Sequence, residues 1–490
     1  MQLRVPRRHW IAAGVVAILV FAAVLVVIKE GGRRHSLAIV DIDPYPARTT
    51  VTACARPLVG KPGVRSFRGM ILSQVGGGDD GMAVCKRIAN ASREYSDHAD
   101  GRAWDWHVDA ARAADRAMVD RVINWLLRTD DRGHRNAMAR RIGITYVIWN
   151  HRYYRVGSDE ARWVPYSGTA DPHDTHVHFS FSVAGAARRT SWWTQRGPLV
   201  WSLATGSDAP IVFGEGALRP VAGDWDGDGR DSAGVYDVIG RRFTLRDAAA
   251  PTVPPLVGSV LATPPPTPSG GPTPSASDGP TPTSGSASAA PSATPTVSTP
   301  GGSPPGGSPP GGPAPDAPEI TTPPVGPFGA IALAGEWDGL GGDEIGVYDP
   351  LSRRFSFLST QGATVRPART FGAAGDLPLV GDWNGDGVDD IGSYTPATQT
   401  YSLLLPDGTV RTEGFGSPND TPVTGDWNGD GSDDIGAFRS SRHTFYRALL
   451  TAGGGSRALS PVSYGAARHL PVIGDWDGDG VDDNGLVNLT

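Results

Sequence analysis

The sequence predicts a multidomain chain with an N-terminal transmembrane helix, an α+β domain, and an all-β propeller of five blades that a disordered insert interrupts. Three observations predict this arrangement. An uncharged apolar run occupies 10–28, helical and strand periodicities alternate within 51–185, and a Gly-Asp-Trp or Gly-Glu-Trp motif recurs five times after residue 197. A chain of 490 residues has room for about two or three domains. Its net charge of −7, without a basic stripe, excludes nucleic acid as the main partner.

The first segment indicates membrane anchoring. The run 10–28 has about the length that a helix needs to cross the hydrocarbon core, and several arginines precede it. It is longer than the apolar part of a usual signal peptide, and no small-residue cleavage site follows it. We therefore expect a signal anchor with residues 1–9 in the cytoplasm, a spacer over 29–50, and a single-pass membrane protein whose bulk is extracellular. A cleaved signal sequence is the alternative.

The α+β domain is expected over 51–185. Apolar residues at helical spacing predict a helix within 109–128, and a second, short helix is expected around 135–141. The run Ile144–Trp149 is typical of a buried strand, and 175–182 alternates as a further strand.

The chain has two cysteines, Cys54 and Cys85, and both precede the histidine motifs described next. In an exported protein such a pair favours one disulfide bond. Two buried thiols are the alternative.

Histidine and aspartate residues in two short strings indicate a metal site. His98 and Asp105 lie in S-D-H-A-D-G-R-A-W-D, and His176 and His178 lie in H-V-H-F-S-F-S. Residues two apart on a strand leave the same face, so both imidazoles of the second string point to one side. Two imidazoles and one carboxylate suit Zn²⁺ and leave a fourth position for water.

The order S-x-H-x-x-G-x-A-x-D followed by H-x-H resembles the hedgehog/DD-peptidase fold, which zinc D-Ala-D-Ala carboxypeptidases, peptidoglycan endopeptidases and phage endolysins of the M15 and LAS type share. The resemblance implies that His98, Asp105 and His178 bind one catalytic zinc ion and that His176 polarises its water or steadies the tetrahedral intermediate. Many M15 enzymes carry a glutamate base three residues before the last histidine ligand, where this chain has Thr175. Asp174 is the neighbouring candidate for a catalytic carboxylate.

The repeats predict the propeller. The first residue after the motif glycine is Glu336, Asp382, Asp426 and Asp475 in the last four copies, which gives intervals of 46, 44 and 49 residues. Such a period with several short strands per unit is typical of propeller blades. The last copy ends near the C-terminus, so strands within 199–216 are expected to complete its blade and close the ring. A β-solenoid is the alternative.

The insert is expected over 252–327, between propeller parts at 197–251 and 328–490. It is rich in Pro, Ser, Thr and Gly, a composition that does not bury a core. A long connection costs little closure entropy, so the insert is compatible with a closed ring.

Acidic loops follow each repeat motif. The pattern D-x-[DN]-x-D-G-x-x-D aims carboxylates at a hard cation, and no helix flanks it as in an EF-hand. These loops resemble calcium-binding FG-GAP or VCBS-type blades, which implies about three to four structural Ca²⁺ ions. Leu340 replaces the central carboxylate of the second repeat, where we expect no calcium, and Ser232 is expected to weaken the first site. Simple Asp-Gly turns are the alternative. The residues assigned to calcium are Asp224, Asp226 and Asp228; Asp382, Asn384, Asp386 and Asp390; Asp426, Asn428, Asp430 and Asp434; and Asp475, Asp477, Asp479 and Asp483.

Together, the two resemblances imply a membrane-anchored extracellular zinc metallopeptidase that cleaves peptidoglycan peptides. Its calcium-stabilised propeller is expected to bind cell-wall polymer or a protein partner. Polypeptides rank second as substrates. The alternative from another class is a non-catalytic cell-surface binding or adhesion protein that retains the peptidase fold.

Overall fold

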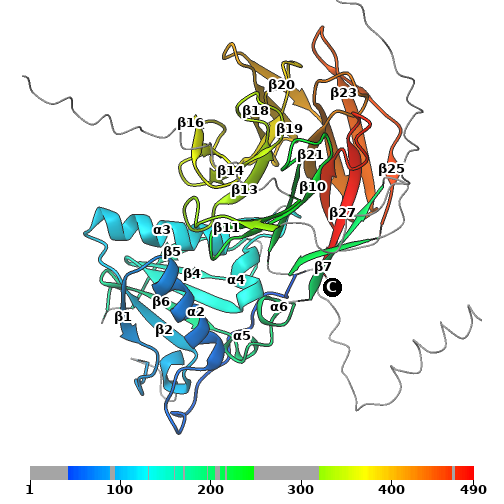
Figure 1. Ribbon diagram of the computed structural model, residues 1–490. Coiled ribbons are helices and arrows are strands. Elements are labelled where there is room, and N and C mark those ends of the chain that lie inside the picture. The colour runs from blue at the N-terminus through cyan, green and yellow to red at the C-terminus, as the bar shows by residue number, and fades with distance from the viewer. Residues whose placement is uncertain are drawn as a thin grey trace, which may run out of the picture. The chain divides into compact units, whose positions relative to one another are not determined.

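The computed structural model describes residues 42–88, 94–130, 132–158, 160–168, 171–195, 197–204, 210–215, 218–247, 319–465 and 469–489. The chain divides into two compact units (Figure 1). Unit 1 comprises Met1–Pro198 with the pieces Glu215–Ala217 and Leu489–Thr490, and unit 2 comprises Leu199–Gly214 and Leu218–Asn488. The anchor expected at 10–28 lies outside the described residues. Among the helices that are described, none combines the length and apolarity needed to span a membrane.

Unit 1 is built on an antiparallel sheet with the strand order β1-β2-β6-β3-β4-β5. Its strands are β1 (Gly78–Gly81), β2 (Ala103–His107), β3 (Ile144–Trp149), β4 (Arg152–Arg155), β5 (Trp163–Pro165) and β6 (His176–Phe181). Its helices are α2 (Pro62–Gln74), the 3-10 turn η1 (Asp97–Asp100), α3 (Ala113–Leu127), α4 (Ala137–Ile142), α5 (Val183–Ala186) and α6 (Ser191–Thr194).

The sequence identified β3, β6, α3 and α4 to within a few residues but missed α2. That helix starts at Pro62, as helices often do, and buries Val64, Phe67 and Ile71 at helical spacing. The Phe67 ring contacts those of Trp104 on β2 and Phe179 on β6 edge-on, at centroid distances of 6.0 and 5.2 Å. Helix α2 therefore covers one face of the central strands and leaves their other face for polar residues.

A disulfide bond joins Cys54 to Cys85, whose Cα atoms lie 5.7 Å apart. It links the segment before α2 to the segment that leads into η1. Cross-linking these segments restricts the unfolded chain and therefore stabilises the folded unit.

Unit 2 contains five antiparallel sheets within the described residues, in a propeller-like arrangement (Figure 1). The first four sheets are β9 (Arg219–Gly223), β10 (Ser232–Asp237), β11 (Arg242–Arg246) and β12 (Glu319–Thr321); β13 (Ile331–Gly335), β14 (Glu344–Asp349), β15 (Arg354–Leu358) and β16 (Thr364–Thr370); β17 (Leu377–Gly381), β18 (Asp390–Thr395), β19 (Thr400–Leu404) and β20 (Val410–Gly414); and β21 (Thr421–Gly425), β22 (Asp434–Arg439), β23 (Thr444–Leu450) and β24 (Ser456–Ala458), with β25 (Val462–Ser463) also on β23.

The fifth sheet combines strands from both ends of unit 2. Its order is β26 (His469–Gly474), β27 (Asp483–Leu489), β7 (Pro198–Leu203) and β8 (Ile211–Glu215). This is the pairing that the repeat pattern predicts. Separate antiparallel sheets are incompatible with the β-solenoid alternative, in which strands of successive turns would form continuous sheets.

The boundary of the expected insert is wrong by one strand. The expected insert includes Glu319–Thr321, but these residues form β12 and pair with β11, where Thr321 lies opposite Thr244. The following Val325 and Phe328 are buried. Proline-rich composition concealed this strand, because an edge strand tolerates neighbouring prolines.

Equivalent carboxylates join each sheet of unit 2 to the next. The eighth residue of each acidic loop accepts a hydrogen bond from the backbone N–H of the first loop residue of a neighbouring sheet, over 2.7–3.1 Å. The last sheet returns to the first, because Asp231 accepts from Asp475. The five carboxylates, which line a central cavity of about 330 Å³, belong to Asp231, Asp343, Asp389, Asp433 and Asp482.

Candidate metal centre

The pairing of β2 with β6 creates the centre of the site. Asp105 lies directly opposite His178 in this antiparallel register, and opposite residues present their side chains on the same face. The alternate residues Trp104 and Phe179 point to the other face and pack against α2. Apolar alternation therefore fixes which side chains are left for the polar face.

His98 reaches the same place from η1. The Ser96 hydroxyl accepts a hydrogen bond from the His98 backbone N–H at 3.4 Å and caps the turn. Gly101 ends the turn with a φ of 77°, and a Cβ there would lie 2.0 Å from the Val59 carbonyl oxygen. Only glycine fits this position, so the glycine in the motif allows the turn to pack against the segment before α2.

The three side chains expected to bind zinc converge. His98 Nε2 lies 3.2 Å from His178 Nδ1 and 3.1 Å from Asp105 Oδ2, and His178 Nδ1 lies 2.9 Å from Asp105 Oδ1. The histidines are buried, whereas the Asp105 side chain retains 22% exposure. The cluster is therefore accessible from one side.

Neighbouring groups orient the His178 ring and favour the charged form of Asp105. Ser180 Oγ lies 2.8 Å from His178 Nε2, and the Tyr146 ring stacks on the His178 ring at a centroid distance of 5.4 Å. Without a metal ion, His178 Nδ1 hydrogen-bonds to Asp105; when an ion displaces that proton, a proton on Nε2 donated to Ser180 directs the Nδ1 lone pair at the ion. Although burial opposes its charge, hydrogen bonds from His178 and His98 hold the pKa of Asp105 well below its ordinary value.

A buried arginine holds η1 in place. Arg102, 2% exposed, donates from Nη2 to Asp97 Oδ1 at 2.9 Å and from Nε to Asp100 Oδ2 at 2.7 Å. It also donates to the Phe181 carbonyl at 2.9 Å, which ties the turn to the end of β6. Arg102 is not among the residues that the sequence predicts to be functional, although an arginine between acidic residues in the motif is a visible signal.

The two residues expected to take part in catalysis lie in and before β6. His176 Nε2 is 3.9 Å from both Asp105 Oδ1 and Asp171 Oδ2. Asp174 is half-buried, and its carbonyl oxygen accepts the Ala110 N–H at 2.7 Å. His173, which belongs to neither histidine motif, is buried, and its ring centroid lies 4.7 Å from that of His176. Burial, reinforced by His178, lowers the pKa of His173 to about 4.

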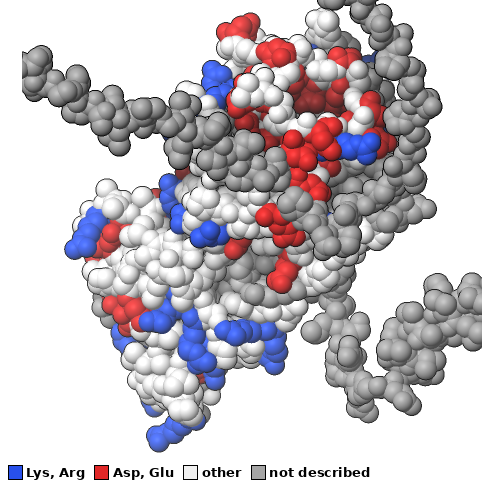
Figure 2. Space-filling view, in the orientation of Figure 1, with Lys and Arg blue, Asp and Glu red and all other residues white. Residues whose placement is uncertain are grey.

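The acidic loops of unit 2 bring their carboxylates together. Figure 2 shows acidic side chains gathered on the visible face of this unit. In the third loop, Asp382 accepts backbone N–H groups from Gly385 and Gly387 at 2.7 Å. The ninth-position carboxylates of the third and fourth loops, Asp390 and Asp434, are buried, and their Oδ2 atoms have no hydrogen-bond partner. Groups of three carboxylates compatible with a cation form in the first, second and fifth loops: Asp224, Asp226 and Asp228; Glu336, Asp338 and Glu344; and Asp475, Asp477 and Asp479.

The second loop therefore retains three acidic side chains although Leu340 replaces its central carboxylate. Leu340 is 84% exposed and takes no part in the group. The absence of calcium from this loop stays a prediction. The ligand pattern expected from the sequence does not include Glu344, which supplies the carboxylate at the ninth position of this loop.

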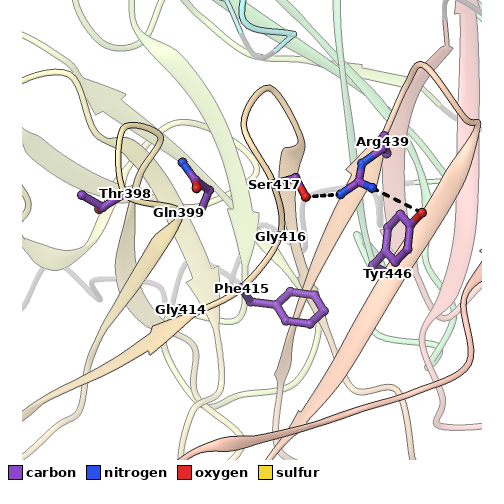
Figure 3. A pocket seen from close by; sticks show the side chains of 8 residues that line it. All are labelled: Thr398, Gln399, Gly414, Phe415, Gly416, Ser417, Arg439 and Tyr446. Atoms are coloured by element: carbon purple, nitrogen blue, oxygen red, sulfur yellow. Dashed lines mark hydrogen bonds between the residues drawn. The ribbon is translucent and has the colours of Figure 1, made fainter.

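A shallow cavity of about 490 Å³ lies on unit 2 (Figure 3). Its only arginine, Arg439, donates to both Asp420 carboxylate oxygens at 2.7–2.8 Å and to Ser417 Oγ at 2.5 Å. Because Asp420 matches this charge, the cavity presents hydroxyl and amide groups rather than an anion site. It is lined by Thr398, Gln399, Gly414, Phe415, Gly416, Ser417, Arg439 and Tyr446.

Comparisons with known proteins find one family match within unit 1. The family model described as VldE, C-terminal domain, matches residues 60–177. No curated protein matches the chain. Among solved structures, selenomethionine-substituted virginiamycin B lyase from Staphylococcus aureus is similar over 71% of this chain and 94% of its own. Its identity of 8% and TM-score of 0.28 carry no argument about fold or function.

The family and activity expected from the sequence are therefore wrong. The segment that carries His98, Asp105 and His176 matches the VldE C-terminal domain rather than an M15 or LAS zinc peptidase. Three expectations are therefore corrected. They are that the chain is such a peptidase fused to FG-GAP or VCBS repeats, that it cleaves peptidoglycan peptides, and that it is an adhesion protein which retains the peptidase fold. The physical reason is that a few ligands at fixed spacing specify a coordination geometry, not a family or a substrate.

Proposed function

We propose that unit 1 is a zinc-binding module in which His98, Asp105 and His178 hold one ion. The observation that carries this proposal is that the nearest ligand atoms of each pair of these residues lie 2.9–3.2 Å apart. Zinc bonds of about 2.0–2.1 Å in a tetrahedron separate neighbouring ligands by roughly 3.3 Å. The side chains therefore fit the ion with little movement.

The chemistry of the donors supports the same ion. Two imidazoles and one carboxylate match the preference of Zn²⁺, whereas Ca²⁺ and Mg²⁺ prefer oxygen donors alone. Three protein ligands leave one position of a four-coordinate ion open, and the exposed edge of Asp105 marks the accessible side. When bound, such an ion supplies Lewis-acid activation of water or of an anionic oxygen group. The module is thus suited to metal-dependent catalysis on an oxygen-containing ligand.

Zinc content of the purified full-length protein tests this proposal. Elemental mass spectrometry after dialysis should find tightly held zinc, and His178→Ala should weaken binding of that ion about 100-fold or more, since it removes a ligand. Ser180→Ala should weaken it by about 10-fold, since it frees the ring that the hydroxyl orients.

The matched control is His107→Ala. His107 lies on β2 opposite His176, but its ring turns away to Asp80, with Nδ1 3.0 Å from Oδ2. This variant should retain the zinc of the unsubstituted protein. Full retention of zinc by His178→Ala would overturn the proposal.

We propose further that the acidic loops of unit 2 bind calcium as a structural ion. The buried, unpartnered Oδ2 atoms of Asp390 and Asp434 support this, because an unpaired buried carboxylate oxygen is costly unless a cation or hydrogen bond compensates it. Burial, together with neighbouring loop carboxylates, raises the pKa of both groups to about 6.

Thermal unfolding with and without chelator tests the calcium proposal. Calcium at about 100 times its dissociation constant should stabilise the folded unit by roughly 2.7 kcal/mol per site, so EGTA should lower the melting temperature. Asp390→Asn should reduce this shift, whereas Asp407→Asn, on an exposed turn outside the loops, should leave it unchanged. Identical melting curves with excess calcium and with EGTA would contradict calcium binding.

A further inference from the structure

A second group of potential metal ligands lies next to the first. Asp171, His173 and His176 each offer one ligand atom, and these atoms lie within 4.8 Å of one another. His176 Nε2 stands 3.9 Å from Asp171 Oδ2 on one side and 3.9 Å from Asp105 Oδ1 on the other. Both separations are too long for a hydrogen bond. The imidazole thus sits between two carboxylates without bonding directly to either.

The backbone of this segment is held firmly on both sides. The carbonyl oxygens of Pro172 and His173 accept the N–H groups of His151 and Asn150, at 2.9 and 2.6 Å. On the other side, the carbonyl oxygens of residues 174 and 175 accept the N–H groups of residues 110 and 108 at 2.7 and 3.1 Å. Little backbone freedom remains to be lost when a ligand binds here, which favours binding.

The ring of His173 is oriented for coordination. Its Nδ1 lies 2.9 Å from the Asp171 carbonyl oxygen, and the His173 backbone N–H donates to Asp171 Oδ1 at 3.0 Å. With the Nδ1 proton donated to a backbone carbonyl, Nε2 carries the free lone pair, as in most metal-binding histidines. His173 and His176 have 9% and 12% of their side chains exposed, whereas Asp171 has 39%.

We propose that Asp171, His173 and His176 bind a second divalent ion of the zinc class beside the ion held by His98, Asp105 and His178. This inference rests on the proposed function of unit 1. Two imidazoles and one carboxylate again select a transition metal over Ca²⁺ or Mg²⁺. His176 then acts as a metal ligand in place of the water-polarising role that the sequence predicts for it.

The geometry ranks the two sites. In the first group each pair of residues already has ligand atoms within 3.2 Å, but in the second His176 Nε2 lies 3.9 Å from Asp171 Oδ2 and must approach it to the roughly 3.3 Å of a tetrahedral zinc site. Asp171 is also the most exposed of the six ligands. The second site therefore fills after the first and with lower affinity.

A pair of ions changes which ligand the centre accepts. Two divalent cations with Asp105 and Asp171 leave a formal charge of about +2, against about +1 for the first ion with Asp105 alone. Paired metal sites commonly bind both oxygens of an anionic group. The inference therefore specifies an oxyanion, such as a phosphate or carboxylate group, as the class of ligand.

Zinc titration of the metal-free full-length protein tests the proposal. Isothermal calorimetry with excess Ca²⁺ present keeps the acidic loops of unit 2 from competing for zinc. The unsubstituted protein should show two binding events, the second at least about 10-fold weaker. Asp171→Asn and His173→Gln should each remove the second event and leave the dissociation constant of the first within about threefold.

The matched control is Asp174→Asn, which neutralises a carboxylate in the same segment but outside the group. It should retain both events. A single event in the unsubstituted protein, lost in His178→Ala, would overturn the second site and leave the first intact. A second event that survives both Asp171→Asn and His173→Gln would overturn it as well, because the ion would then bind elsewhere. Loss of zinc binding altogether would instead overturn the proposed function.

Discussion

The two units assemble their candidate metal sites in opposite ways. In unit 1, His178 lies 80 residues from His98 and 73 from Asp105, so the centre exists only once the sheet has formed. In unit 2, each acidic loop draws its potential ligands from about nine consecutive residues and repeats the design. A distributed site depends on every contact that holds its elements together. A local loop needs its own turn and one contact with the neighbouring sheet.

This contrast predicts that loss of one buried contact in unit 1 abolishes its centre. Arg102→Ala leaves Asp97, which is 4% exposed, as a buried carboxylate without its cation. Removing one partner of a buried ion pair costs about 3–5 kcal/mol. Because η1 carries His98, zinc binding should fall together with stability. Chemical denaturation and zinc titration of the same variant measure both effects.

The control for this prediction is an exposed ion pair in the same unit. Arg112 has 72% of its side chain exposed and lies 3.5 Å from Asp109. Arg112→Ala should change stability by less than about 0.5 kcal/mol and leave zinc binding unchanged. Equal losses in the two variants would show that η1 does not depend on its buried pair.

A smaller and more local effect is expected from one glycine of unit 2. Gly381 ends β17, and a Cβ there would lie 2.6 Å from Asp433 Oδ2 and 2.6 Å from the Trp383 ring. Gly381→Ala should therefore disturb the junction between the third and fourth sheets and cost about 1–3 kcal/mol. Zinc binding in unit 1 should not change. Calorimetric melting and zinc titration separate the two units.

Gly414→Ala is the matched control, because Gly414 ends β20 of the same sheet and a Cβ there meets nothing within 4 Å. Its melting temperature should stay within a degree or two of the unsubstituted protein, since exposed substitutions of this kind change stability by about 0.5 kcal/mol or less. If both alanines cost the same, the close approach of Asp433 is not the cause.

The same contrast explains what the sequence could predict. Strand alternation placed His176 and His178 on one face, and repetition predicted the strands that complete the last sheet of unit 2, because both signals are local or periodic. The pairing of Asp105 with His178 followed only from a motif, since register between distant strands leaves no mark in the intervening sequence. That motif identified three side chains that converge, but it led to the wrong family assignment.

The sequence does not predict the roles of two kinds of residue, although both residue types are visible in it. The eighth residue of each loop, such as Asp433, lies outside the predicted ligand pattern, but its carboxylate accepts an N–H from the neighbouring sheet. His173 lacked a motif and proved to be buried beside His176. In both cases the partner lies on another strand or sheet, so only three-dimensional proximity gives the residue its role.

The smallest expected effect is on the stability of unit 1 in acid, which should depend on the buried ion cluster around Asp130. Asp130 lies 3.1 Å from His134 Nδ1 and 2.6 Å from Arg141 Nη2. Burial opposes its charge, but the His134 hydrogen bond and the Arg141 charge hold the pKa of Asp130 well below its ordinary value. The contribution of Asp130 to folding stability is therefore complete above about pH 4, its pKa in the unfolded chain, and is lost as the pH falls toward its lower pKa in the folded chain.

Asp130→Asn should destabilise unit 1 at pH 7, and the difference from the unsubstituted protein should shrink by pH 3. Denaturant unfolding at the two pH values measures this, and a difference that stays constant would mean that Asp130 acts through packing rather than charge.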